Sequence, residues 1–96
     1  MKRPFRKNRK VEREFERFQE NFGMVVRLLR KKRHLSRPEL ARLAKFSQTT
    51  LEHIEQGKTN PSLTRLENLA TALRYCLSYI FKLAQDMDES AHTERK

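Results

Sequence analysis

One short segment of this 96-residue chain carries hydrogen-bonding side chains at helical spacing: Gln48, Thr49, Glu52 and His53. Ser47 precedes the segment and can cap a helix, and Gly57 follows it, where a helix commonly ends. Leu51 and Ile54 would face inward on such a helix and leave the polar residues outside. Amide, hydroxyl, carboxylate and imidazole groups can read base edges in the major groove of DNA. We therefore expect these four residues to read bases, mainly through the two at the N-terminal end of the helix.

Further polar residues within or around this helix suit the DNA backbone: Arg37, Thr50, Lys58, Thr59, Asn60 and Arg65. Lys58 supplies charge, and Thr59 and Asn60 can donate hydrogen bonds to phosphate. An ordinary turn at Asn60-Pro61 is the alternative explanation of the loop 57–62. Because the loop directly follows the base-reading helix, we favour phosphate contact.

A second short helix is predicted immediately before the base-reading helix. Ser36 followed by Glu39 makes a capping box. An apolar stripe at helical spacing comes next: Leu40, Ala41, Leu43 and Ala44. Residues 44–46 are too few for a loop and suit a tight turn. Residues 36–57 therefore predict two short helices joined by a turn.

Longer helices are expected on both sides, over residues 22–33, 63–74 and 75–87, with Ser62 capping the second. The apolar faces of the first two predict core residues, namely Phe22, Val25, Val26 and Leu29, then Leu63, Leu66, Ala70 and Leu73 with Leu69 flanking. The third has one apolar stripe of Leu77, Ile80, Phe81 and Ala84 and a second of Tyr79 and Leu83. The basic residues from Arg27 to Arg33, Arg30 among them, are assigned to the solvent face and the helix end. Gly23 either allows a close helix approach or breaks the chain into two helices.

The segment 36–57 resembles the helix-turn-helix of the phage-repressor and Cro-like (XRE-type) transcriptional regulators. The resemblance runs from about Phe22 to Phe81 and rests on the joint spacing of FGMVVRLLRKKRHLS, ELARLAKFS, IEQGKTNPSL and LATAL. It implies an all-α, compact five-helix lambda-repressor-like DNA-binding domain with an N-terminal helical extension, five or six helices in all. The family usually has glycine at the positions of Lys45 and Arg74. Lysine in the turn is therefore expected to cost about 1 kcal/mol of strain, and the helix that ends at Arg74 is expected to end less sharply.

The resemblance also implies the function. The expected activity is sequence-specific binding of double-stranded DNA by a transcriptional regulator, a repressor, that reads a two-fold operator as a homodimer. Where the family often has glutamine, Arg37 can make a phosphate contact. The alternative is an antitoxin-type protein-binding module that neutralises a partner toxin and also binds DNA. The protein is expected to be encoded by a bacterium or a phage and to act in the cytoplasm, at the nucleoid.

The two ends of the chain lie outside the resemblance. Residues 1–10 hold six positive charges and no negative one, which predicts either a disordered basic arm or an arm that lies along DNA. Residues 11–21 predict a helical extension whose stripe continues into the domain: Val11, Phe15, Phe18 and Phe22. This stripe packs either on its own domain or on a second subunit or another protein. Residues 22–87 form the helix-turn-helix domain, and residues 88–96 form a polar tail expected to be frayed.

The last predicted helix carries more apolar surface than one small core can absorb. A dimer interface is the natural use, and its expected residues are Leu77, Tyr79, Ile80 and Leu83.

Composition limits the remaining function classes. The chain has 22 Lys and Arg against 12 Asp and Glu, a formal net charge of +10, which favours nucleic acid or an acidic surface. Cys76 is the one cysteine and fits a reducing compartment. We expect no enzyme, cofactor or metal site, because His34, His53 and His92 lack ligand partners at metal spacing. We also expect no membrane segment. RNA binding stays open, although no RNP-like aromatic motif supports it.

Overall fold

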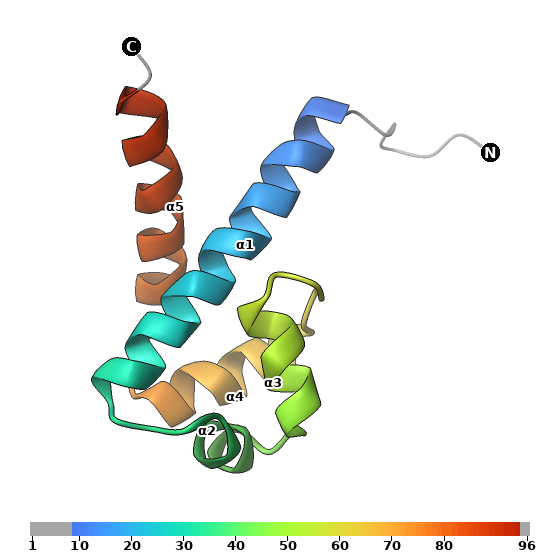
Figure 1. The fold of residues 1–96 in the computed structure, drawn as a ribbon, viewed down its shortest axis with the longest axis vertical. Coiled ribbons are helices and arrows are strands. Elements are labelled where there is room, and N and C mark those ends of the chain that lie inside the picture. Colours follow the sequence, from blue (N-terminus) through green and yellow to red (C-terminus); the bar gives the residue numbers. More distant parts are fainter. Residues whose placement is uncertain (1–8, 95–96) are drawn as a thin grey trace, which may run out of the picture.

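The computed structural model describes residues 9–94 of the chain, with side chains over residues 9–87. Over these residues the chain forms five α-helices and no strand, which confirms the predicted all-α fold (Figure 1). The helices are α1 Arg9–Lys32, α2 Arg37–Ala44, α3 Gln48–Glu55, α4 Leu63–Leu73 and α5 Leu77–Glu94. Residues 1–8 of the predicted basic arm lie outside the described residues, and its last two residues begin α1.

Helix α1 is continuous across the predicted boundary between residues 11–21 and 22–33. A Cβ atom added to Gly23 would lie 2.5 Å from the carbonyl oxygens of both Ile54 and Glu55. Gly23 therefore serves a close approach between α1 and α3, and the alternative in which it breaks the chain into two helices is wrong. Figure 1 shows the N-terminal half of α1 projecting beyond α2, α3 and α4 and diverging from α5.

Three serines begin the inner helices as predicted. The hydroxyl of Ser36 accepts a hydrogen bond from the Glu39 N–H at 3.2 Å, and the Glu39 carboxylate accepts one from the Ser36 N–H at 2.8 Å. Ser47 caps α3 and Ser62 caps α4 through the hydroxyl alone, which accepts from the N–H of Thr50 and of Arg65 respectively. Each cap satisfies an amide that the first helical turn leaves without a partner.

Among the described residues, three that are not glycine adopt the left-handed backbone conformation just after a helix: His34 at φ 60°, Lys45 at φ 66° and Arg74 at φ 65°. The strain expected at Lys45 is thus present. The less sharp end expected at Arg74 is wrong, because its N–H donates to the carbonyls of Ala70 and Thr71 and closes α4. Gly57 adopts φ 71° just after α3, where the sequence predicts the helix to stop.

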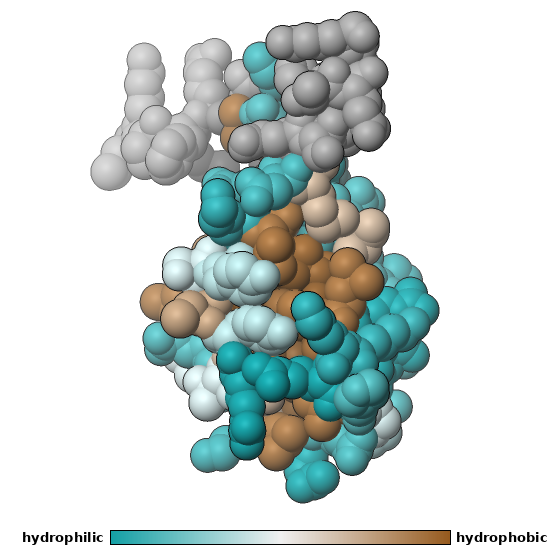
Figure 2. Space-filling view, turned by 90° about the vertical axis from the view of Figure 1, so that its left-hand side faces the viewer, coloured by the Kyte–Doolittle hydropathy of each residue, from teal (hydrophilic) through white to brown (hydrophobic). Residues whose placement is uncertain are grey.

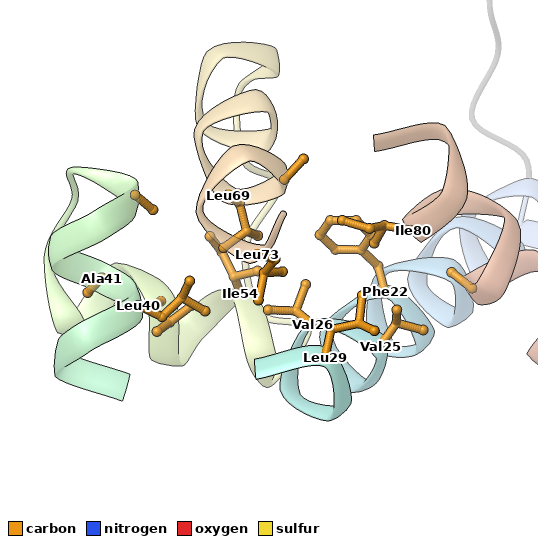
Figure 3. Packing of buried hydrophobic residues seen from close by; sticks show 14 residues of the cluster. Phe22, Val25, Val26, Leu29, Leu40, Ala41, Ile54, Leu69, Leu73 and Ile80 are labelled. Carbon is orange, nitrogen blue, oxygen red and sulfur yellow. The ribbon is translucent and has the colours of Figure 1, made fainter. Parts of the chain in front are cut away.

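The core lies where α1, α2, α3, α4 and the start of α5 meet (Figure 3). Most predicted core residues are buried there. Leu69 was expected only to flank the core, yet it is fully buried at its centre. Two predictions are wrong: Leu63 is 69% exposed and Leu43 is 47% exposed. Leu63 is the first residue of α4 and points back beyond the core, and Leu43 lies at the edge of the narrow face that an eight-residue helix can bury.

The N-terminal extension packs partly on its own domain. The rings of Phe18, Phe22 and Phe81 form a cluster with centroids 5.6–6.4 Å apart, which joins α1 to α5. Nearer the N-terminus on the same stripe, Val11 is 59% exposed and Phe15 is 47% exposed. The backbone of α5 is helical to Glu94, so this helix continues into the predicted polar tail.

Candidate nucleic-acid interface

Helix α3 presents the predicted base-reading residues on its outer side. Leu51 and Ile54 are buried and anchor the helix to the core. Three of the four predicted residues are exposed, namely Gln48, Thr49 and His53, and Glu52 is half-buried. The helix therefore offers a row of hydrogen-bonding groups to a ligand that lies across it.

The N-terminal cap of α3 also involves a predicted phosphate residue. The Thr50 hydroxyl lies 2.8 Å from the Ser47 hydroxyl, and the Thr50 N–H donates to Ser47 Oγ at 3.0 Å. Thr50 is half-buried. Its side chain thus already stabilises the cap, and its part in holding phosphate stays a prediction.

The tight turn between α2 and α3 has the predicted length. The N–H of Lys45 donates to the Arg42 carbonyl at 3.2 Å, and the N–H of Phe46 donates to the Ala41 carbonyl at 3.1 Å. These bonds close α2 and let α3 start within three residues. The turn therefore holds the two helices in one fixed arrangement.

The loop after α3 is tied to both neighbouring helices. The N–H of Lys58 donates to the His53 carbonyl at 2.9 Å, and the side-chain amide of Gln19 on α1 donates to the Thr59 carbonyl at 3.0 Å. Lys58 and Asn60 are exposed, and Thr59 is half-buried. Arg65, in the first turn of α4, is also exposed. The predicted phosphate residues of this region therefore lie along one ordered loop and the helix that follows it.

A buried ion pair, which the sequence pattern missed, fixes α3 against α1. The Arg30 Nε donates to Glu55 Oε2 at 2.7 Å, and its Nη1 donates to the Leu35 carbonyl at 2.9 Å. Arg37 on α2 approaches the same carboxylate, with Nε 3.1 Å from Glu55 Oε1. The assignment of Arg30 to the solvent face is thus wrong. The one available signal was its register, since it follows Val26 by four residues and therefore shares the buried face.

Among the residues whose side chains the structure describes, the Glu39 carboxyl of the α2 capping box has a clearly shifted pKa. The pKa of the Glu39 carboxyl is lowered, first by the hydrogen bond from the Ser36 backbone N–H and then by the Ser36 side chain, with a smaller contribution from the positive charge of Arg42. Burial acts weakly in the opposite direction. Glu39 is therefore held as the carboxylate that the cap requires.

An apolar face covers the outside of α1 and α5. Figure 2 views the side on which α5 lies in Figure 1 and shows a brown apolar patch down the middle of that face. A hollow of about 530 Å³ lies there, lined by residues of both helices that include Leu28, Tyr79, Leu83 and Met87. Of the predicted interface residues, Tyr79 is 46% exposed, and Leu77 and Leu83 are half-buried. Ile80 is fully buried in the core of its own chain, so its assignment to a dimer interface is wrong.

The part of the chain that the structure describes contains neither a metal-binding cluster nor a membrane-spanning helix. No cluster of three or more His, Cys, Asp or Glu side chains among these residues is arranged to hold a metal ion. None of the described helices combines the length and the apolar character that crossing a membrane requires.

The helix-turn-helix domain model matches residues 21–75, from the second half of α1 to the end of α4. The chain is 33% identical over 72 residues to the competence pilus inhibition repressor of Acinetobacter baylyi, an alignment that covers 75% of this chain and 66% of that protein. It is 40% identical over 58 residues to the immunity repressor protein of Bacillus phage phi105, which covers 60% of this chain and 40% of that protein. The chain thus spans less than two thirds of either relative.

A solved structure shows the same arrangement of helices. The restriction-modification controller protein from Aeromonas hydrophila superposes with a TM-score of 0.63 at 32% sequence identity, and the match covers 65% of this chain and 94% of that one. The family match, the repressor relatives and the shared fold all indicate a helix-turn-helix regulator, and the exposed polar row lies on the second helix of that motif, α3. The chain belongs to the helix-turn-helix family of phage-repressor and Cro-like transcriptional regulators.

Proposed function

We propose that this chain is a sequence-specific DNA-binding repressor that reads a two-fold operator as a homodimer. The observation that carries the proposal is the exposed polar row of α3, held rigidly by the buried Leu51 and Ile54. A helix of this kind fits the major groove, and the residues at its N-terminal end point most directly at base edges. The repressor names of two relatives support the sign of regulation. Such a protein would act in the cytoplasm at the nucleoid.

Backbone contacts accompany base reading in this proposal. The exposed Lys58 and Asn60 follow α3 in a loop that hydrogen bonds fix on both sides. Such contacts position a protein on the duplex but carry no sequence information. The net charge of +10 adds attraction for any DNA, which weakens steeply with salt because phosphate neutralisation releases counterions.

The experiment separates base reading from backbone binding. Gln48→Ala should lose about 1–3 kcal/mol of preference for the operator over a scrambled duplex, because a glutamine–adenine pair discriminates by that amount. Lys58→Ala should weaken binding to both duplexes by similar factors. The operator is first selected from a random DNA pool, and both variants are then titrated against both duplexes at one salt concentration. A Gln48→Ala protein with the full specificity ratio would mean that α3 does not enter the groove as proposed.

We infer the homodimer from the apolar face of α1 and α5. Tyr79 and Leu83 of α5 line one hollow together with the exposed Leu28 of α1, so the surface is broader than the α5 residues alone. Monomeric proteins rarely expose a continuous apolar patch of this kind. A two-fold axis through this face would give the dimer two symmetry-related copies of α3, one for each half of a two-fold operator.

A second candidate is the antitoxin-type module that binds a protein partner through the N-terminal half of α1. The exposed Val11 and Phe15 favour it, together with an apolar hollow of about 160 Å³ whose lining includes Phe15, Phe18 and Phe81. Co-expression with the product of the adjacent gene tests this candidate. Phe15→Glu should abolish co-purification and leave DNA binding intact, whereas an uncharged polar change, Leu63→Gln, at an exposed residue of α4 should preserve both.

A further inference from the structure

One buried carboxylate is shared by two arginines from different helices. Glu55 is the last residue of α3, and its carboxylate lies 2.7 Å from Arg30 Nε on α1 and 3.1 Å from Arg37 Nε on α2. The side chain of Glu55 is 2% exposed and that of Arg30 is 8% exposed, whereas that of Arg37 is 37% exposed. The cluster therefore reaches from the core to the surface at the N-terminal end of α2.

The three charges are not equivalent. One negative charge faces two positive charges, so the cluster carries a surplus of +1. Arg30 is enclosed and donates to both Glu55 oxygens and to the Leu35 carbonyl. Within the described residues, the Arg37 side chain makes one hydrogen bond, through Nε. The surplus charge is therefore located at the exposed guanidinium.

An arginine held through Nε keeps its other edge free. The two terminal nitrogens of a guanidinium carry four N–H donors in a planar fork, which matches two oxygens of a phosphate. A lysine cannot donate to Glu55 and present such a fork at the same time, because its charge is a single ammonium group.

We infer that Glu55 is a positioning residue for DNA binding, which orients Arg37 so that its terminal nitrogens clamp one backbone phosphate. The inference rests on the proposed DNA-binding function and deepens it. Glu55 belongs to α3, so the carboxylate that orients the phosphate clamp also moves with the base-reading helix. Arg30 anchors this carboxylate to α1 and so fixes the clamp relative to the core. The orientation exists before DNA arrives, and less side-chain freedom is lost on binding.

The test compares arginine variants that leave the buried Arg30–Glu55 pair in place. Arg37→Lys keeps the charge but loses the fork, and it should bind a 20-base-pair random-sequence duplex about three- to tenfold more weakly with an unchanged salt slope. Arg37→Ala should also reduce the log–log salt slope by about 0.9, as expected for one lost phosphate contact. Arg42→Lys is the matched control, because Arg42 is an exposed arginine on the same helix. It should bind like the wild type.

A double-mutant cycle identifies the role of Glu55. In a Glu55→Gln background, Arg37→Lys should cause little further loss, because the orientation of Arg37 is already lost. Since Glu55→Gln leaves Arg30 without its counter-charge, circular dichroism at the assay temperature gives the folded fraction by which each affinity is corrected. Fully additive losses in this cycle would overturn the inference.

The arginine variants decide the inference even if Glu55→Gln does not fold. An Arg37→Lys protein that binds DNA as tightly as the wild type would overturn it and leave the proposed DNA-binding function standing. A wild-type protein that binds neither this duplex nor any selected sequence would instead overturn the proposed function itself.

Discussion

Replacing Gly23 by alanine sets two effects of opposite sign against each other. Alanine is favoured over glycine inside a helix by about 0.8–1 kcal/mol, and Gly23 is an interior residue of α1. The new methyl group, however, would lie 2.5 Å from the carbonyl oxygens of Ile54 and Glu55. Ordinary carbon-to-oxygen contacts are about 3.3–3.6 Å, so α1 and α3 would have to separate by nearly 1 Å.

The cost of separating α1 from α3 should exceed the gain in helix propensity. Both contacting atoms are backbone atoms of α3, which cannot rotate away as a side chain can. Forcing a methyl group into a close-packed interior commonly costs about 1–3 kcal/mol, and backbone contacts belong at the upper end. After the helix-propensity gain is subtracted, we expect a net loss of about 2 kcal/mol. For a domain of this size that lowers Tm by about 8–16 °C.

Thermal unfolding followed by circular dichroism measures this loss, at one protein concentration because a dimer makes Tm concentration-dependent. Met24→Ala is the control, since Met24 is the next residue on α1 and is exposed. It should change Tm by only a few degrees. A Gly23→Ala protein with an unchanged or higher Tm would refute the close approach of α1 and α3.

Three further predictions concern the caps and the dimer. Arg74→Gly should raise the free energy of unfolding by about 0.5–1 kcal/mol in a urea titration, because relief of left-handed strain outweighs the entropy cost of glycine; a lower value would mean that the arginine is unstrained. Glu39→Gln should lower the urea midpoint at neutral pH, and the gap to the wild type should close as the pH falls through the lowered pKa of Glu39, since a depressed carboxyl pKa stabilises only above that range. A gap that persists at low pH would exclude the carboxylate as its cause. Charged residues in place of both Tyr79 and Leu83 should give monomers in light scattering with helicity intact. A charged residue at the exposed Leu63 should leave the dimer in place. If the double variant remains a dimer, the interface lies instead at Val11 and Phe15.

The sequence predicted those features that depend on local chemistry. Ser36, Ser47 and Ser62 begin helices as expected, because capping needs only a short side chain and the amides that follow it. The left-handed turn at Lys45 followed from the resemblance to a family with glycine there. The polar row on α3 followed from spacing alone, and its exposure agrees with that prediction.

Features that depend on a distant part of the chain were missed. Arg30 and Glu55 are 25 residues apart, and each alone looks like a solvent-exposed charge. Leu43 and Leu63 fit an apolar stripe, but the width of the stripe that a neighbouring helix covers is a tertiary property. Ile80 was assigned to an interface because spacing does not distinguish a residue facing its own core from one facing a second chain.

The uninterrupted α1 has a mechanical consequence. At 1.5 Å per residue, about 21 Å of helix separates Arg9 from Gly23, and about 14 Å separates Gly23 from Lys32. Gly23 lies against the backbone of α3, and this contact can serve as a pivot for α1 as a stiff rod. A molecule that pushes the projecting end sideways by about 2 Å would then move the far end by somewhat more than 1 Å in the opposite direction. The rod would press on the carbonyls of Ile54 and Glu55 at the end of the base-reading helix. A contact at the N-terminal end of α1 would therefore change the position of α3 without any hinge within α1.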